Sequence, residues 1–270
     1  MGSMSVQSVG PADVVAQIER VKTGWVELFT LWCVLLGIFK HATGKKLIFA
    51  SPCAGIQLEA IIGKRPEIKK RLMLSADELA VLLNAHMKPD NLLSVKILLA
   101  TGVRISELFT ALRENVFITE ARWHIPQSKT GPAMDIPLVP CVIEWFKELF
   151  ELAGNSVYVL PARLRTRIER YDGDAHVSKD AIREAIDYWI ENHTPAIRRF
   201  TPHDLRSTMK SHMRKLGVSR DISEMCLNHK LSGVEGIYDQ HSYYEERRAA
   251  LTVWSEFLSG CQLKKAAAQR

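Results

Sequence analysis

The stretch TPHDLRST, residues 201–208, opens a predicted helix and carries two side chains suited to binding an anion. Thr201 is a favourable N-cap residue, and the proline after it fits the first helical position, where its missing N–H costs nothing. His203 and Arg206 are three residues apart, so they share one face of the helix. Because a helix N-terminus and an arginine fork both favour phosphate, this pattern indicates a phosphate site. On this stretch alone, a capping histidine and a solvated arginine are the simpler alternative.

Two further stretches carry residues of the same kind. LLATGVRISEL, residues 98–108, places Arg104 directly after a glycine-containing turn. CLNHKLSGVEGIYDQ, residues 226–240, places His229 nine residues before Tyr238. An arginine, a His-x-x-Arg pair, a histidine and a tyrosine therefore follow one another in this order along the chain.

These three blocks resemble those of the tyrosine recombinase (phage integrase) family. The matching family patterns are T-G-x-R-x-x-E-L, H-x-L-R, and L-G-H followed nine residues later by the nucleophilic tyrosine. Asn228 stands where the family most often has glycine, and asparagine tolerates the left-handed backbone of a helix end. The sequence YEERRAALTVWSEFL, residues 244–258, looks most like prophage and genomic-island integrases of the P4-like group.

The resemblance implies a catalytic set, which is Arg104, Lys129, His203, Arg206, His229 and Tyr238. Tyr238 is expected to attack a DNA phosphodiester and form a 3′-phosphotyrosyl link, with no cofactor and no metal. The two arginines and His229 are expected to hold the charged phosphate oxygens. His203 is the candidate base for the tyrosine, and Lys129 is the candidate proton donor to the leaving 5′-oxygen.

Alternatives stay open for several of these residues. Lys129 is otherwise a solvated lysine at a loop tip, and Glu107 is expected to orient Arg104 rather than react. Tyr243 and Tyr244 lie close to the predicted nucleophile, but the nine-residue spacing selects Tyr238. The histidines at 203, 212, 229 and 241 fit no standard zinc pattern.

Three functional hypotheses follow. The leading one is a site-specific DNA recombinase that integrates or excises a mobile element. A type IB topoisomerase uses the same residue types, so a nicking and closing enzyme is a sister hypothesis. A DNA-binding protein of the same fold with weak or lost catalysis is the third.

The rest of the chain predicts an α+β fold that is mainly helical, with one small antiparallel sheet. RWHIP, residues 122–126, and MDIPL, residues 134–138, alternate apolar and polar residues, which indicates a hairpin closed by QSKTGPA. Ser75 and Glu78 form a predicted capping box at the start of a helix. Further helices are expected at about 178–193, 202–216, 219–226 and 243–258, with an irregular segment at 161–177 and a disordered tail.

The expected domain organisation has a short front. Residues 1–62 are predicted to be a truncated helical core-binding segment with a vector-like start, and 63–72 a linker. Residues 73–260 are predicted to be the catalytic domain, and 261–270 a tail. The run WVELFTLWCVLLGIF, residues 25–39, is apolar on nearly all sides, so it needs burial on several sides. It is short for a bilayer span and contains Glu27.

Charge favours a nucleic-acid partner. The formal net charge is +6 and the sequence pI is about 9.1. The candidate contacts to the DNA backbone are Lys64, Arg65, Lys69, Lys70, Arg71, Arg163, Arg165 and Arg167. Solvated charged faces are an equal alternative for both basic segments.

The resemblance also implies partners and a location. Double-stranded DNA attachment sites, a homotetramer on DNA, a directionality factor and a host DNA-bending protein are expected. The amphipathic segment at 250–258 suits docking on a neighbouring subunit or packing on its own. Five scattered cysteines without a CxxC pair, and the absence of a signal-peptide pattern, favour a reducing interior. The expected location is the bacterial cytoplasm at the nucleoid, away from membranes.

Overall fold

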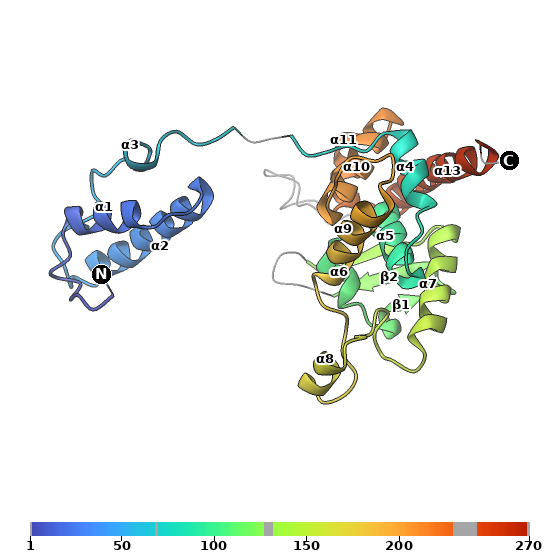
Figure 1. Ribbon diagram of the computed structural model, residues 1–270, viewed down its shortest axis with the longest axis horizontal. Coiled ribbons are helices and arrows are strands. Elements are labelled where there is room, and N and C mark those ends of the chain that lie inside the picture. The colour runs from blue at the N-terminus through green and yellow to red at the C-terminus, as the bar shows by residue number, and fades with distance from the viewer. Residues whose placement is uncertain (1, 68–69, 127–131, 229–241, 269–270) are drawn as a thin grey trace. The chain divides into compact units, whose positions relative to one another are not determined.

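The computed structural model describes residues 2–67, 70–126, 132–228 and 242–268 (Figure 1). The chain divides into two compact units, Met1–Lys70 and Arg71–Arg270. Each unit has its own hydrophobic core, so each is described by itself.

Three helices form the first unit: α1 (Pro11–Arg20), α2 (Trp25–Gly44) and α3 (Leu58–Ile62). Val14 and Ile18 of α1 are fully buried against one side of α2, where Trp32 and Phe39 are also buried. The spacing of four residues in α1 and of seven in α2 places one apolar stripe of each helix in the core. The helix at α1 was not predicted from the sequence.

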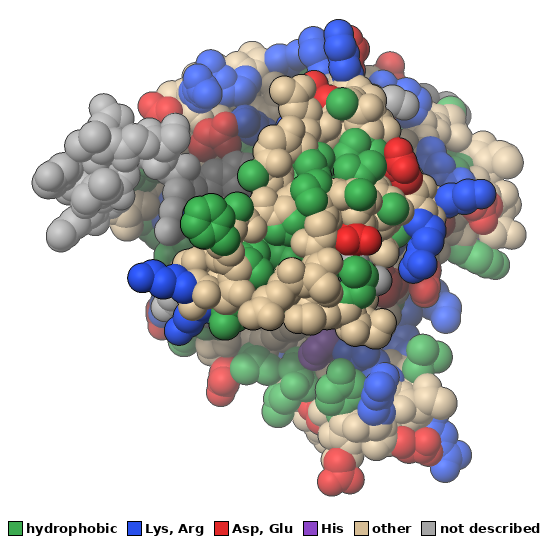
Figure 2. All heavy atoms as spheres, turned by 90° about the vertical axis from the view of Figure 1, so that its left-hand side faces the viewer, with side chains coloured by type: hydrophobic (Ala, Val, Ile, Leu, Met, Phe, Trp, Pro, Cys, Tyr) green, Lys and Arg blue, Asp and Glu red, His purple; other side chains and the backbone are tan. Residues whose placement is uncertain are grey.

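The opposite side of α2 stays exposed. Val26, Phe29, Val34 and Ile38 are exposed, although the sequence indicated burial on several sides. Figure 2 shows hydrophobic side chains gathered on this unit, on the face turned to the viewer. By length and composition alone α2 could cross a membrane, and a core helix of a soluble protein passes the same test.

The second unit is mainly helical with a three-stranded sheet (Figure 1). Its helices are α4 (Ala76–Leu83), α5 (Pro89–Thr101), α6 (Ile105–Phe109), α7 (Pro140–Ala153), α8 (Arg165–Arg170), α9 (Ala181–His193), α10 (Pro202–Lys215), α11 (Arg220–Cys226) and α13 (Tyr244–Ala268). A short 3-10 turn, Arg113–Asn115, precedes the sheet. The predicted α+β class with one small antiparallel sheet is confirmed.

The sheet has the order β1 (Val116–Phe117), β2 (Arg122–Ile125) and β3 (Met134–Pro137), all antiparallel. The two predicted hairpin strands are β2 and β3. Trp123 lies opposite both Val116 and Ile136, and all three are buried on the same face of the sheet. This face packs on the helical core, which fixes the register of the hairpin.

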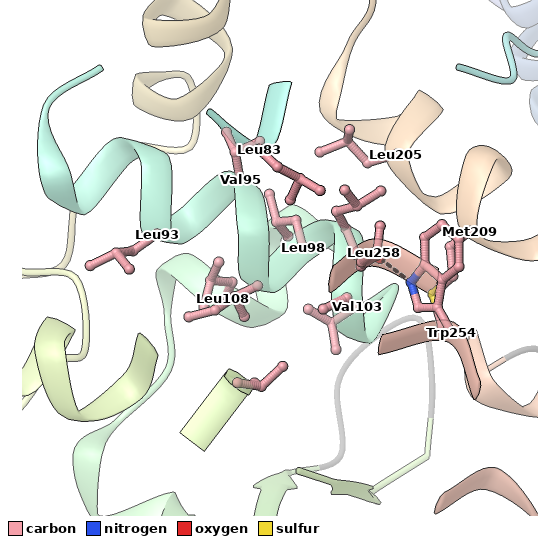
Figure 3. Close-up of a cluster of buried hydrophobic side chains, with 14 of the residues drawn as sticks. Leu83, Leu93, Val95, Leu98, Val103, Leu108, Leu205, Met209, Trp254 and Leu258 are labelled. Carbon is pink, nitrogen blue, oxygen red and sulfur yellow. Dashed lines mark hydrogen bonds between the residues drawn. The ribbon is translucent and has the colours of Figure 1, made fainter. Parts of the chain in front are cut away.

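Helix α5 runs through the core of the second unit (Figure 3). Its Leu98 is buried among side chains from α4, α10 and α13, including Leu83 and Met209. Trp254 of α13 is fully buried, and its indole Nε1 donates a hydrogen bond to the main-chain oxygen of Leu99 at 3.0 Å. The buried tryptophan thus fastens α13 to the central helix.

At the end of the chain the structure bears on one open alternative and corrects one prediction. Leu251, Trp254 and Leu258 are buried in the protein's own unit, so of the two alternatives for 250–258 the structure shows packing within one chain. The tail was predicted to be disordered, which is wrong, because α13 continues to Ala268. The added residues lack proline and are rich in alanine and lysine, which are strong helix formers.

The predicted irregular segment at 161–177 contains one short helix, α8. Arg165 and Glu169 pair across one turn of it, with an Nε to Oε1 distance of 2.7 Å. Such pairs support a short helix modestly. In contrast, the Ser75 capping box is confirmed, since the Glu78 N–H donates to Ser75 Oγ at 3.2 Å and the Ser75 N–H donates to Glu78 Oε2 at 2.7 Å.

Candidate active site

The first arginine of the candidate site follows a turn that only glycine fits. Helix α5 ends at Thr101, and Gly102 has a φ of +64°, in the left-handed region. A Cβ on Gly102 would lie 2.5 Å from Met209 Sδ and 2.7 Å from Leu227 Cδ2. The glycine therefore lets α5 turn directly into α6 while α10 and α11 pack closely on the turn. This places Arg104 at the N-cap of α6.

The carboxylate of Glu107 holds Arg104, which agrees with the expectation that Glu107 orients this arginine. The Arg104 main-chain N–H donates to Glu107 Oε2 at 2.6 Å, and its Nη1 donates to Oε1 at 2.8 Å. The glutamate is buried, so the guanidinium has a fixed orientation. Its Nη2 also reaches the main-chain oxygen of Asn228 at 3.5 Å.

Helix α10 supplies the second arginine. Its start is fixed by Asp204, whose Oδ2 accepts from the Thr201 N–H at 2.9 Å and from the Thr201 hydroxyl at 2.7 Å. His203 lies exposed in the first turn, while Arg206 is only 4% exposed. Arg206 donates from Nη1 to the oxygen of Gly102 and from Nη2 to the oxygen of Leu227, the latter at 2.8 Å.

The two arginines lie close enough to repel each other. Burial, followed by the positive charge of Arg104, lowers the pKa of the Arg206 guanidinium to about 10. The carboxylate of Glu107 opposes this shift. Two cations sharing one carboxylate leave a net positive site, and an anion such as a phosphate would complete the charge balance.

The chain that enters the second unit holds α10 in place. The hydroxyl of Ser207 donates to the oxygen of Leu72 at 2.6 Å, and the Leu74 N–H donates to Thr208 Oγ1 at 3.0 Å. His212 Nε2 donates to the oxygen of Leu74 at 2.8 Å. Burial lowers the pKa of His212, which favours this neutral form. The helix that carries His203 and Arg206 is therefore braced between Ser207 and His212.

A second brace fixes the loop in front of α10. Arg198 donates from Nε to Glu78 Oε1 at 2.7 Å and from Nη2 to Glu78 Oε2 at 2.6 Å. The Arg198 main-chain N–H adds a bond to Glu78 Oε1 at 2.9 Å. The guanidinium holds the pKa of the Glu78 carboxyl well below its ordinary value, at about 2.

Replacing Arg198 by glutamine is expected to lower the melting temperature at pH 7. A carboxyl whose pKa is depressed in the folded state stabilises it above its unfolded pKa, here 4.5. That contribution is lost as the pH falls towards 2. The difference in melting temperature between the two proteins should therefore shrink between pH 5 and pH 2. Thermal scans across this range measure it. Arg199→Gln, which removes exposed ion pairs, is the control, and a pH-independent difference would contradict the assignment.

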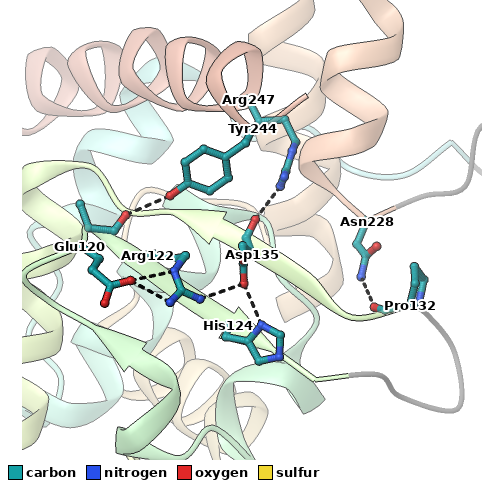
Figure 4. Close-up of polar contacts among 9 residues, drawn as sticks. Glu120, Arg122, His124, Pro132, Asp135, Asn228, Tyr244 and Arg247 are labelled. Atoms are coloured by element: carbon teal, nitrogen blue, oxygen red, sulfur yellow. Dashed lines mark hydrogen bonds and ion pairs between the residues drawn. The ribbon is translucent and has the colours of Figure 1, made fainter. Parts of the chain in front are cut away.

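Three of the predicted catalytic residues, Lys129, His229 and Tyr238, lie outside the described residues, so their roles stay predictions. The ends of the segments that carry them are described. Asn228 has a φ of +52°, which confirms the left-handed backbone expected there, and its Nδ2 lies 3.5 Å from the oxygen of Pro132 (Figure 4). The ends of the hairpin connection and of the His229 segment thus meet beside Arg104.

The basic residues predicted to contact DNA occupy different settings. Lys64, Arg65, Lys70 and Arg71 are exposed, and Lys69 lies outside the described residues. Arg163 pairs with Asp90 and donates to Asn91, and Arg167 donates to the oxygen of His176 at 2.6 Å, so both have internal partners. Arg165 is almost fully exposed.

A groove of about 810 Å3 lies between α9 and the segment that carries Arg163 and Arg167. His86, Lys88, Arg163, Arg167, Tyr188 and Trp189 are among the residues that line it. Basic and aromatic side chains together suit a sugar-phosphate backbone. Among the described residues, no group of three or more His, Cys, Asp or Glu side chains is arranged to hold a metal ion.

One buried arginine was missed by the sequence analysis. Arg247 lies in the first turn of α13 and donates to the main-chain oxygens of Ser242 and Asp135. In the sequence it stands beside Arg248 in a polar run, and nothing in the spacing separates a buried from an exposed arginine there.

Comparison with known proteins finds integrases that are similar to this chain. Prophage integrase IntZ of Escherichia coli is 24% identical over 263 residues, covering 95% of this chain and 61% of the relative. The chain therefore spans less than two thirds of that relative's length.

Solved structures share the fold. An integrase of the transposon Tn1549, in complex with a circular intermediate DNA, aligns with a TM-score of 0.65 and 16% identity over 93% of this chain and 87% of that one. A lambda integrase dimer bound to a core site aligns with a TM-score of 0.61 and 16% identity, over 90% and 81%. Residues 71–245, which hold both arginines and the segment of Tyr238, match the family described as the phage integrase family. The chain, with one arginine at the N-cap of α6 and another on α10, belongs to the phage integrase family.

Proposed function

We propose that this protein is a site-specific DNA recombinase of the tyrosine type, which cleaves and rejoins DNA to integrate or excise a mobile element. The supporting observation is the meeting of Arg104 and Arg206 at one cationic site, although they are 102 residues apart in the sequence. Family membership over residues 71–245 supports the same reaction.

The arginines stabilise the charge that develops on a phosphodiester during cleavage. When Tyr238 attacks phosphorus, negative charge grows on the non-bridging oxygens, and guanidinium groups bind such oxygens through parallel donors. Glu107 fixes one guanidinium, and the oxygens of Gly102 and Leu227 fix the other, so little reorganisation is needed. His229 is proposed to add a further donor.

Proton transfers complete the step. A tyrosine has an ordinary pKa of about 10, so a base must take its proton at neutral pH. His203, exposed beside Arg206 at the start of α10, is proposed as that base. The Tyr238 oxygen then forms a bond to phosphorus as the bond to the 5′-oxygen breaks, and Lys129 is proposed to protonate that oxygen. The phosphotyrosyl link conserves the bond energy for rejoining.

The division of the chain into two compact units supports a two-domain organisation. We propose that residues 1–62 form part of a core-binding domain, 63–72 the linker and 73–260 the catalytic domain. The Tn1549 and lambda integrase structures hold DNA, and the lambda protein is a dimer on its site. For this chain, attachment sites in duplex DNA, a homotetramer on DNA, a directionality factor, a host DNA-bending protein and a place at the bacterial nucleoid are proposed.

A nicked DNA substrate tests the proposal. It spans an end junction of the genomic element that encodes the chain, and the nick releases a short 5′-hydroxyl fragment after cleavage, which prevents rejoining. A covalent protein–DNA band on a denaturing gel, formed in excess chelator, is the expected result. Binding without any such band would indicate a DNA-binding protein that lacks catalysis. Relaxation of supercoiled DNA lacking the junction would indicate a topoisomerase.

A further inference from the structure

Arg247 ties the start of α13 to the sheet. Its side chain is buried, with an exposed fraction of 5%. Nη1 donates to the main-chain oxygen of Asp135 in β3 at 2.8 Å (Figure 4). Nε and Nη2 donate to the main-chain oxygen of Ser242 at 3.3 Å and 3.2 Å. One guanidinium thus joins two chain segments that are 107 residues apart.

Burying this charge is costly, so the hydrogen bonds matter. Burial lowers the pKa of Arg247, which shows that the charged form loses hydration inside the protein. Its neighbour Arg248 has a 46% exposed side chain and pairs with Glu245 at 3.2 Å. Arg248 therefore makes a surface ion pair, whereas the guanidinium of Arg247 donates to main-chain oxygens inside the fold.

The Asp135 end of this link is rigid. In the antiparallel pairing of β2 and β3, Asp135 lies opposite His124. Its carboxylate accepts from His124 Nδ1 at 2.7 Å and from Arg122 Nη1 at 3.3 Å (Figure 4). The carbonyl that Arg247 binds is therefore fixed by both the main chain and the side chain of the same residue.

Ser242, at the other end of this link, is the first described residue after the segment that carries Tyr238. Tyr243 has a φ of +48°, which a non-glycine residue adopts only where its surroundings require it. The oxygen of Tyr243 accepts from the Arg247 N–H at 2.9 Å, so Arg247 contacts this turn through its main chain as well. Ser242 follows Tyr238 by four residues, and an extended chain of that length spans at most about 14 Å. The position of Ser242 therefore limits where the Tyr238 hydroxyl can reach.

We propose that Arg247 is a positioning residue for the nucleophile: by fastening Ser242 to β3 it sets the anchor from which Tyr238 reaches the scissile phosphate. This inference rests on the proposed function. Arg104 and Arg206 hold Asn228 and Leu227 at the other end of the same stretch of chain, so both of its ends are fastened to the second unit by arginines. Because its side chain is buried, Arg247 acts through the main chain of Ser242 rather than by contact with DNA.

The test compares Arg247→Gln with the parent protein and with Arg248→Gln, a matched control one residue away. At saturating protein, the rate of covalent adduct formation on the nicked substrate is expected to fall about 10²-fold in Arg247→Gln, because small misplacements of a reacting group cost that much. Arg248→Gln is expected to react at the parental rate. Affinity for the DNA, measured by mobility shift, is expected to stay within twofold in both variants.

A sulfur-substituted substrate separates positioning of the nucleophile from other defects. Sulfur in place of the leaving 5′-oxygen needs no proton on departure, because a thiol has a pKa of about 8.5. The defect of Arg247→Gln is expected to persist on this substrate at the same fold-change, whereas Lys129→Ala is expected to recover. Recovery of Arg247→Gln on the sulfur substrate would overturn the proposal, since the defect would then lie in proton donation.

Folding is controlled by a second variant. Arg247→Lys keeps the charge but not the fork, so it is expected to fold and to react more slowly than the parent. If Arg247→Gln does not fold, a parental rate in Arg247→Lys overturns the proposal. If the parent protein binds the junction but forms no adduct, the proposed function fails instead, which is a distinct result.

Discussion

Replacement of Tyr238 by phenylalanine is expected to abolish the covalent protein–DNA adduct while DNA binding survives. The variant lacks only the hydroxyl oxygen that is proposed to bond to phosphorus, so the phosphotyrosyl link is expected not to form. The aromatic ring and the basic residues that provide affinity remain. A denaturing gel with the nicked substrate measures the adduct, and a mobility shift measures binding.

Two nearby tyrosines serve as controls for this experiment. Tyr244 is a helical residue whose hydroxyl lies 3.4 Å from the oxygen of Ala121, so it is engaged within the fold. Tyr243→Phe and Tyr244→Phe are both expected to retain the adduct. An undiminished adduct in Tyr238→Phe would assign the nucleophile to another residue, and loss in Tyr244→Phe alone would select that one.

Replacement of Arg206 by glutamine is expected to lower the rate of adduct formation by about 10²–10³-fold, the usual loss when one donor to a developing oxyanion is removed. Glutamine keeps a hydrogen-bond donor near the oxygens of Gly102 and Leu227 but carries neither the fork nor the charge. Single-turnover rates at saturating protein measure the chemical step rather than binding.

Arg214→Gln is the matched control, because Arg214 lies exposed on the same helix. It is expected to react at the parental rate. Melting temperatures show whether Arg206→Gln is folded. A folded Arg206→Gln that forms the adduct at the parental rate would remove Arg206 from the catalytic set.

The sequence predicted best those features that depend on neighbouring residues. The capping box of Ser75 and Glu78, the hairpin of β2 and β3, and the helix start at Thr201 all follow from local patterns, and the structure contains each of them. The left-handed backbone of Asn228 is likewise a local property of a helix end.

Features that depend on packing between distant segments could not be predicted in the same way. Arg247 and Arg248 are adjacent and chemically identical, yet only the first meets the oxygen of Asp135. The apolar pattern of α2 indicated burial on several sides, but which side is covered depends on what packs against it. Similarly, Arg163 and Arg167 read as free surface charges until the structure shows Asp90 and His176 beside them.

The crowding of Arg104 and Arg206 has a consequence for the protein before it meets its substrate. Like charges held together repel each other, and this repulsion adds to the effect of burial in lowering the pKa of Arg206. A polyanion that binds between the two arginines offsets this repulsion. Because it binds only the folded state, it is expected to stabilise the second unit against unfolding. Thermal stability and the proposed affinity for DNA then both depend on the repulsion between these two arginines. A substitution that removes one of the two charges is therefore expected to raise the stability of the free protein and to weaken its binding of the anion.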